Sequence, residues 1–161
     1  MIFIGFPITS EKGSIFTPST IAADFNKGVE AAERGDFATA FNEWEPLANQ
    51  GDSSAQYNIG RMYQHGYGLP KDINKALFWF KKAAEQGYDR AQYNLGVMYD
   101  KGEGVPEDDS KAIYWYKEAA EQGNDRAQYN LAIMYQSGEG VPEDDSKAIY
   151  WYKKAAEQNH S

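Results

Sequence analysis

Four asparagines, each preceded by an aromatic residue, recur along the chain and are the side chains best suited to holding a ligand. They are Asn26, Asn58, Asn94 and Asn130, preceded by Phe25, Tyr57, Tyr93 and Tyr129. An amide can donate to and accept from a peptide backbone, so a row of amides could hold an extended chain without reading its sequence. The aromatic rings could anchor a partner. Both groups can instead serve the protein's own packing, and the two interpretations remain open.

Positions further along the same helix face differ between copies of the repeat described below, which makes them candidates for partner specificity. Arg61 and His65 add positive charge to an acidic protein and would suit an acidic tail or a terminal carboxylate. The predicted partner-binding residues are Asn26, Tyr57, Asn58, Arg61, His65, Tyr93, Asn94, Val97, Asp100, Lys101, Tyr129, Asn130, Ile133 and Gln136. We expect them to contact another protein or a peptide.

Catalytic residues are hard to assemble from this sequence. Nucleophilic catalysis needs a serine, cysteine or threonine beside an oriented base, but the chain has no cysteine and its two histidines are His65 and His160. The motifs G-x-S-x-G, S-x-x-K and H-E-x-x-H are absent, and the glycine-rich turns are not followed by the lysine of a phosphate-binding loop. The sequence therefore predicts no catalytic residue and no cofactor.

Acidic residues cluster in two turns that are repeats of one another. They are Glu103, Glu107, Asp108 and Asp109, and then Glu139, Glu143, Asp144 and Asp145. Clustered carboxylates suggest calcium, but their spacing is not that of an EF-hand loop. Helix capping by Asp108 and a solvated edge are the simpler interpretation, so no metal site is predicted.

The overall composition restricts the classes of partner. A net charge of −8 and an isoelectric point near 4.8 argue against a nucleic acid or an anionic membrane as the partner, and leave a basic partner open. The absence of cysteine excludes disulfides and zinc–thiolate sites. No apolar run approaches the roughly 20 residues that cross a bilayer, so membrane insertion is not expected.

A repeat of 36 residues must position these side chains. Copies begin at Ala55, Ala91 and Ala127, and the last two differ at only five of 32 aligned positions. A weaker copy begins at Ala23, lacks four residues at its turn and contains Pro46 in its second helix. We therefore divide the chain into a leader, 1–22, and a repeat domain, 23–161, with repeats at about 23–54, 55–90, 91–126 and 127–161.

Each repeat has the pattern of two helices joined by a turn. In the third copy Ala91, Leu95 and Met98 form one apolar stripe, the turn 101–106 contains two glycines and a proline, and a second stripe runs through 112–120. Stacking such pairs buries both stripes in a solenoid. Small residues such as Gly96 should allow close helix approach, and we expect Trp79, Trp115 and Trp151 to fill the space opposite them.

Residues 1–22 differ from the rest of the chain. Their apolar start is followed by Lys12, whereas a secretory signal carries its positive charge before the apolar run. This leader is a degenerate signal segment, a non-native leader or a cap on the first helical pair. At the other end, the last helix pair has no polar cap, which suggests self-association through that face or a chain that belongs to a longer array.

The pattern L-G-x-M-Y-x-x-G-x-G-V-P-x-D-x-x-K-A-x-x-W-Y-x-x-A-A-x-Q-G resembles the Sel1-like repeat, a relative of the tetratricopeptide repeat. The resemblance covers about residues 23–158. It implies an all-α fold, a right-handed αα superhelix of about four helical hairpins, and a scaffold or adaptor that binds its partner in a concave groove formed by the first helix of each repeat. Some proteins similar to this family are linked to penicillin binding, which makes a weak β-lactamase activity the alternative. Many bacterial members act at the cell envelope or are exported, and the compartment, periplasmic, secreted or cytoplasmic, stays open.

Overall fold

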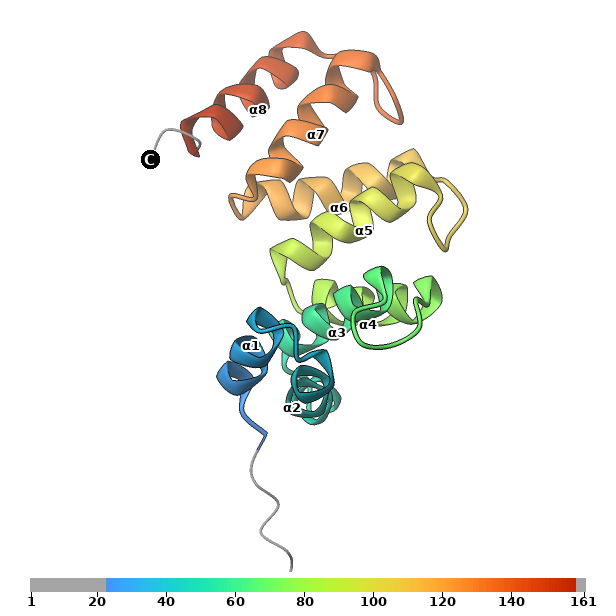
Figure 1. The fold of residues 1–161 in the computed structure, drawn as a ribbon. Helices are drawn as coiled ribbons and strands as arrows, with labels where there is room; N and C mark the ends of the chain where they lie inside the picture. Colours follow the sequence, from blue (N-terminus) through green and yellow to red (C-terminus); the bar gives the residue numbers. More distant parts are fainter. Residues whose placement is uncertain (1–22, 159–161) are drawn as a thin grey trace, which may run out of the picture.

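The repeats fold as four helix pairs that stack into an all-α superhelical solenoid (Figure 1). The computed structural model describes residues 23–158, and within that range the chain forms helices and turns but no strand. The leader lies outside the described residues, so its three interpretations stay open. The helices are α1 (Phe25–Glu33), α2 (Phe37–Asn49), α3 (Ser53–His65), α4 (Ile73–Glu85), α5 (Asp89–Lys101), α6 (Asp109–Glu121), α7 (Asp125–Ser137) and α8 (Asp145–Gln158).

The helix ends form where the sequence places capping residues. The Asp108 side chain accepts a hydrogen bond from the Lys111 backbone N–H at 3.0 Å, which caps α6 as predicted. Gly102 ends α5 in the left-handed conformation at φ 66°, which an L side chain would rarely adopt. Pro46 lies inside α2, also as predicted. No helix between residues 23 and 158 is both long enough and apolar enough to cross a membrane.

Close packing between the two helices of a repeat depends on a glycine facing an aromatic ring, but the ring is not the predicted one. A Cβ added at Gly60 would lie 2.8 Å from the Phe80 ring, and one at Gly96 would lie 2.4 Å from the Tyr116 ring. The expectation that tryptophans fill these spaces was therefore wrong. Trp115 is only half-buried, and it packs against the core between α4 and α5.

Buried glutamines join each repeat to the next. Gln92 of α5 donates to the Ala84 carbonyl at the end of α4 at 3.2 Å, and accepts from the Gln122 amide at 2.7 Å. Gln56 and Gln128 make the same pair of contacts in the neighbouring repeats. Each of these carbonyls also accepts from the backbone N–H of the glycine three residues later, so the glutamine adds a second donor where water is excluded and links one repeat to the next.

Replacing Gln92 with Met, which is similar in size, is expected to lower the free energy of unfolding by about 1–2 kcal/mol, because the Ala84 carbonyl would lose its second donor and the Gln122 amide would lose its acceptor. Urea denaturation followed by circular dichroism measures the change. Gln50→Met, at an exposed glutamine, is the control and should change stability by less than about 0.5 kcal/mol. Equal effects of the two substitutions would contradict the proposed contribution of this contact.

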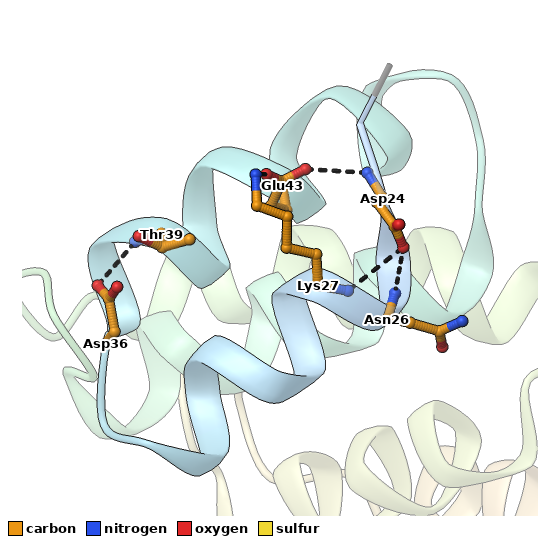
Figure 2. A network of polar contacts seen from close by, with 6 residues as sticks. All are labelled: Asp24, Asn26, Lys27, Asp36, Thr39 and Glu43. Carbon is orange, nitrogen blue, oxygen red and sulfur yellow. Dashed lines mark hydrogen bonds and ion pairs between the residues drawn. The ribbon is translucent and has the colours of Figure 1, made fainter. Parts of the chain in front are cut away.

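An ionic network holds the first helix pair together (Figure 2). The Glu43 carboxylate of α2 accepts from the Asp24 backbone N–H at 2.9 Å and pairs with the Lys27 ammonium of α1. The Asp24 side chain in turn caps α1 by accepting from the backbone N–H groups of Asn26 and Lys27. The hydrogen bond from Lys27 lowers the pKa of Glu43 and raises the pKa of Lys27.

Because the pKa of Glu43 is lowered in the folded protein, its contribution to stability is present above the ordinary carboxyl pKa and is lost as the pH falls through the lowered value. Glu43→Gln is therefore expected to lower the melting temperature at neutral pH and to make it less dependent on pH in the acid range. Melting curves between neutral and acidic pH test this, with the exposed Glu45→Gln on the same helix as control. A pH profile parallel to that of the wild type would contradict it.

Candidate functional site

A cavity of about 610 Å³ opens between α3, α5 and the start of α7. Its walls come from three successive repeats, because the first helices of those repeats lie along the same side of the stack. The lining residues are Tyr57, Arg61, Gln64, His65, Arg90, Tyr93, Asn94, Asn124, Asp125 and Arg126.

Two further cavities adjoin the first one. One, of about 550 Å³, is lined from α5, α7 and α8, and the other, of about 370 Å³, from α5, α6, α7 and the turn that follows α7. Tyr93 lines all three cavities, Arg126 lines two and Asn130 lines two. We call the surface formed by these three adjoining cavities the groove. It follows the first helices of the second, third and fourth repeats.

Most of the residues predicted to bind a partner lie in this groove. The predicted residues that line it are Tyr57, Arg61, His65, Tyr93, Asn94, Val97, Asp100, Lys101, Tyr129, Asn130 and Ile133. Asn26 is exposed on α1, and Asn58 is half-buried on α3. Gln136 accepts a hydrogen bond from the Tyr152 hydroxyl at 2.8 Å. The placement is thus established, whereas the binding role of each residue stays a prediction.

The aromatic row of the groove is only partly available to a ligand. Tyr57 and Tyr93 are half-buried and pack against the cores beneath them, and burial raises the pKa of the Tyr57 hydroxyl. Tyr129 is 53% exposed, with its ring 5.6 Å from that of Tyr152. Tyr57 and Tyr93 therefore form much of the groove floor, and Tyr129 offers the more accessible ring.

Two of the predicted residues, Asp100 and Asn130, lie next to the buried Tyr116 hydroxyl. Its hydroxyl donates to the Asp100 carboxylate at 3.1 Å, and the Asn130 amide lies beside the same hydroxyl. Burial raises the pKa of Tyr116, so the phenol stays protonated and can keep donating. The Asn130 amide can therefore interact with the protein's own side chains as well as with a ligand, and both sequence interpretations of this residue stay open. The second repeat has Phe80 at this position and cannot form this link.

Positive charge concentrates in the first cavity although the protein is acidic. Arg61, Arg90 and Arg126 line it, and they are three of the four arginines of the chain. Burial, followed by the nearby Arg61 and Lys71, lowers the pKa of His65, so this imidazole is mostly neutral at pH 7. The charge of the cavity at neutral pH therefore comes from the guanidinium groups and from Asp125.

Sequence reasoning missed Arg90 and Arg126 as site residues. The sequence analysis began each repeat at the recurring Ala-Gln pair. The helices α5 and α7 begin two residues earlier, at Asp89 and Asp125. The arginines therefore lie in the first turn of each helix rather than in a loop. The available signal was the Asp-Arg pair that precedes both the third and the fourth copy.

The described residues do not gather the ligands that a metal ion would need. Between residues 23 and 158 no three histidine, aspartate or glutamate side chains converge to hold a metal ion. Asp108 and Asp144 of the acidic turns instead cap α6 and α8 and pair with Lys111 and Lys147. The His65 ring stacks on Tyr67 at 5.1 Å.

A second surface, which the sequence analysis did not identify, lies on the second helices. Phe78, Tyr114 and Tyr150 occupy equivalent positions in three repeats and are each about half exposed (52%, 54% and 52%). Each ring lies edge-on against the tryptophan that follows it in the sequence. None of these three exposed rings lines a cavity of the groove, so they provide a control surface for binding experiments.

Comparison with known proteins agrees with the repeat pattern and the fold. A protective antigen of uropathogenic Escherichia coli with an SLR fold superposes at a TM-score of 0.71 and 43% identity, over 73% of this chain and 25% of that one. A Sel1 repeat protein from Oxalobacter formigenes superposes at 0.80 and 34% identity, over 83% of this chain and 55% of that one. The mouse DAP3-binding cell death enhancer 1 is 41% identical over 59 residues, which are 36% of this chain and 12% of that protein.

The Sel1 repeat profile matches residues 53–88, 89–124 and 125–160. These are the second, third and fourth sequence repeats, offset by two residues, and their bounds coincide with the starts of α3, α5 and α7. The match covers more than half of the chain. Sel1 repeats are typically protein–protein interaction modules and are generally not catalytic. The chain belongs to the Sel1-repeat family.

Proposed function

We propose that this protein is a scaffold that binds a partner protein or peptide in the groove along α3, α5 and α7. The observation that carries the proposal is where the near-identical third and fourth repeats differ. At three of their five differences the residue of the third repeat, Val97, Asp100 or Lys101, lines the groove, and so does Ile133, the fourth-repeat equivalent of Val97. Substitution at the lining of a cavity, in copies otherwise alike, fits a surface adapted to a ligand.

The groove also has the chemical character of a protein-binding surface. It combines tyrosine rings and arginines, which are enriched among the residues that contribute most to protein interfaces, with amides that can hydrogen-bond a peptide backbone. The mouse relative is named for binding the protein DAP3, and its similarity to this chain supports a binding role of the same general class.

A weak β-lactamase activity is the alternative that the family resemblance raised. It requires a nucleophile beside an oriented base, whereas His65, the only histidine among residues 23–158, makes no hydrogen bond to a described side chain. We therefore propose a non-enzymatic role. Turnover of a chromogenic cephalosporin above background, lost on mutating one groove residue, would contradict it.

Affinity capture followed by a binding measurement on the identified partner tests the proposal. The groove variant is Asn94→Ala/Tyr129→Ala/Ile133→Ala, and the control is Phe78→Ala/Tyr114→Ala/Tyr150→Ala on the other surface. We expect the groove variant to weaken the measured affinity roughly tenfold or more, and the control to match the wild type. Loss of affinity only in the control would place the partner on the second helices and contradict the proposal.

Self-association is a second candidate that one observation favours. Ile113 of α6 is 8% exposed because the turn containing Gly140 covers it, whereas the equivalent Ile149 of α8 is 53% exposed. The α8 face thus offers the surface that another repeat covers in the middle of the array. Sedimentation that shows a monomer at all concentrations would contradict this candidate.

A further inference from the structure

Three arginines from separate segments meet in the first cavity of the groove, and none of them is neutralised within the described chain. Arg61 comes from the middle of α3, Arg90 from the first turn of α5 and Arg126 from the first turn of α7. Between residues 23 and 158 none of the three forms an ion pair or a side-chain hydrogen bond. The Arg61 guanidinium lies 6.0 Å from the centre of the Tyr57 ring.

Three lysines at equivalent positions in the repeats contrast with these arginines. Lys75, Lys111 and Lys147 pair with the aspartates that cap their own helices. The charge of these lysines is therefore partly compensated by the capping aspartates, while the arginine charge is left available in the first cavity. Walls of low dielectric constant concentrate the potential of such charges and attract a ligand of opposite sign.

The other groups in the cavity leave it positive. Asp125 is its one acidic lining residue, so three guanidinium groups face one carboxylate. Asp89 lies nearby but already accepts a hydrogen bond from the Asn124 amide at 2.8 Å. Asn94 adds an amide to the lining, which can hold a peptide backbone beside the charged group.

We propose that this arginine-lined cavity binds a carboxylate on an extended segment of the partner. The inference rests on the proposed function, which it extends by naming the chemistry of the segment. A guanidinium group offers paired N–H donors that match the two oxygens of a carboxylate, and such charged hydrogen bonds are stronger than neutral ones. The carboxylate belongs either to an acidic side chain or to the C-terminus of the segment.

Short fluorescent peptides measured by anisotropy test the chemistry and separate the two sources. One peptide carries several glutamates and an amidated C-terminus, the second replaces every glutamate with glutamine and stays amidated, and the third is the glutamine peptide with a free C-terminus. We expect one carboxylate-bearing peptide to bind at least about tenfold more tightly than the amidated glutamine peptide, with an affinity that falls as salt rises. Whichever of the two binds identifies the source of the carboxylate.

Matched variants test the site itself. Arg61→Val gives the second repeat the residue that the third has at Val97, and Arg126→Gln removes a second positive charge. We expect each to weaken the binding of the tighter of the two carboxylate-bearing peptides roughly tenfold, whereas Arg34→Gln, at the fourth arginine beyond the end of α1, should leave it unchanged. Circular dichroism confirms that the variants keep their helix content.

Equal binding of all three peptides, or unchanged binding in the arginine variants, would overturn the inference. The proposed function is judged separately, with the partner identified by capture. If that partner binds Arg61→Val/Arg126→Gln normally but is lost by the groove variant, the carboxylate inference fails and the scaffold function stands. If neither set of substitutions affects the partner, both fail.

Discussion

Replacing Phe80 with Ala is expected to lower the free energy of unfolding by about 3–5 kcal/mol, the largest effect that we predict for a single residue. The ring is fully buried in the core between α4 and α5, together with Leu95 and Met98. It also lies directly against Gly60 of α3, so its removal opens a cavity at the contact between two helices of one repeat. Urea denaturation followed by circular dichroism measures the change.

Phe78→Ala provides a matched control, because Phe78 lies on the same helix and is 52% exposed. We expect Phe78→Ala to lower the free energy of unfolding by less than about 1 kcal/mol, because little buried apolar surface is lost. If the two substitutions lowered the free energy of unfolding equally, the assignment of Phe80 to the core and of Phe78 to the surface would be wrong.

The second large effect is expected for Gly96→Ala. In an open helix this change would stabilise the protein by roughly 1 kcal/mol, because alanine is the better helix former. Here the new methyl group would lie 2.4 Å from the fully buried Tyr116 ring, so the helices must move apart. We expect a net destabilisation of about 1–3 kcal/mol, measured by the same denaturation experiment.

A double-mutant cycle isolates the contact between Gly96 and Tyr116. In a Tyr116→Leu background the obstructing ring is absent. Gly96→Ala should then lower the free energy of unfolding much less than in the wild type, or should stabilise the protein. Ala132 is the equivalent residue in the fourth repeat, where Tyr152 is more exposed than Tyr116 and the packing accepts a methyl group. An unchanged cost of Gly96→Ala in the Tyr116→Leu background would contradict this explanation.

The helices and their order could be predicted because the repeat supplies the same signals three times. The turn with Gly102 and the cap at Asp108 recur at a fixed spacing, so each signal confirms the others. The choice of ring opposite Gly96 could not be predicted in the same way. Trp115 and Tyr116 are adjacent on one apolar stripe, and only the angle at which the helices cross decides which of them faces the glycine.

The candidate site was predicted in part. The groove face of α5 and α7 follows from the helical period, which is why residues such as Asn94 and Ile133 lie where expected. Gln92 was missed because a polar residue beside an alanine suggests a surface, and its partner is a carbonyl of the preceding repeat. Arg90 and Arg126 were missed because the sequence analysis began each repeat after them, whereas they lie in the first turns of α5 and α7 and line the first cavity.

The central claim is that the chain binds its partner through the groove, and site-specific photo-crosslinking tests it most directly. A photo-reactive side chain is placed at Asn94, which lines the first cavity, and in a second protein at Lys117, which is exposed on α6. With the identified partner, we expect crosslinking from position 94 and none from position 117. Crosslinking from position 117 alone would contradict the account, because the partner would then bind the second helices rather than the groove.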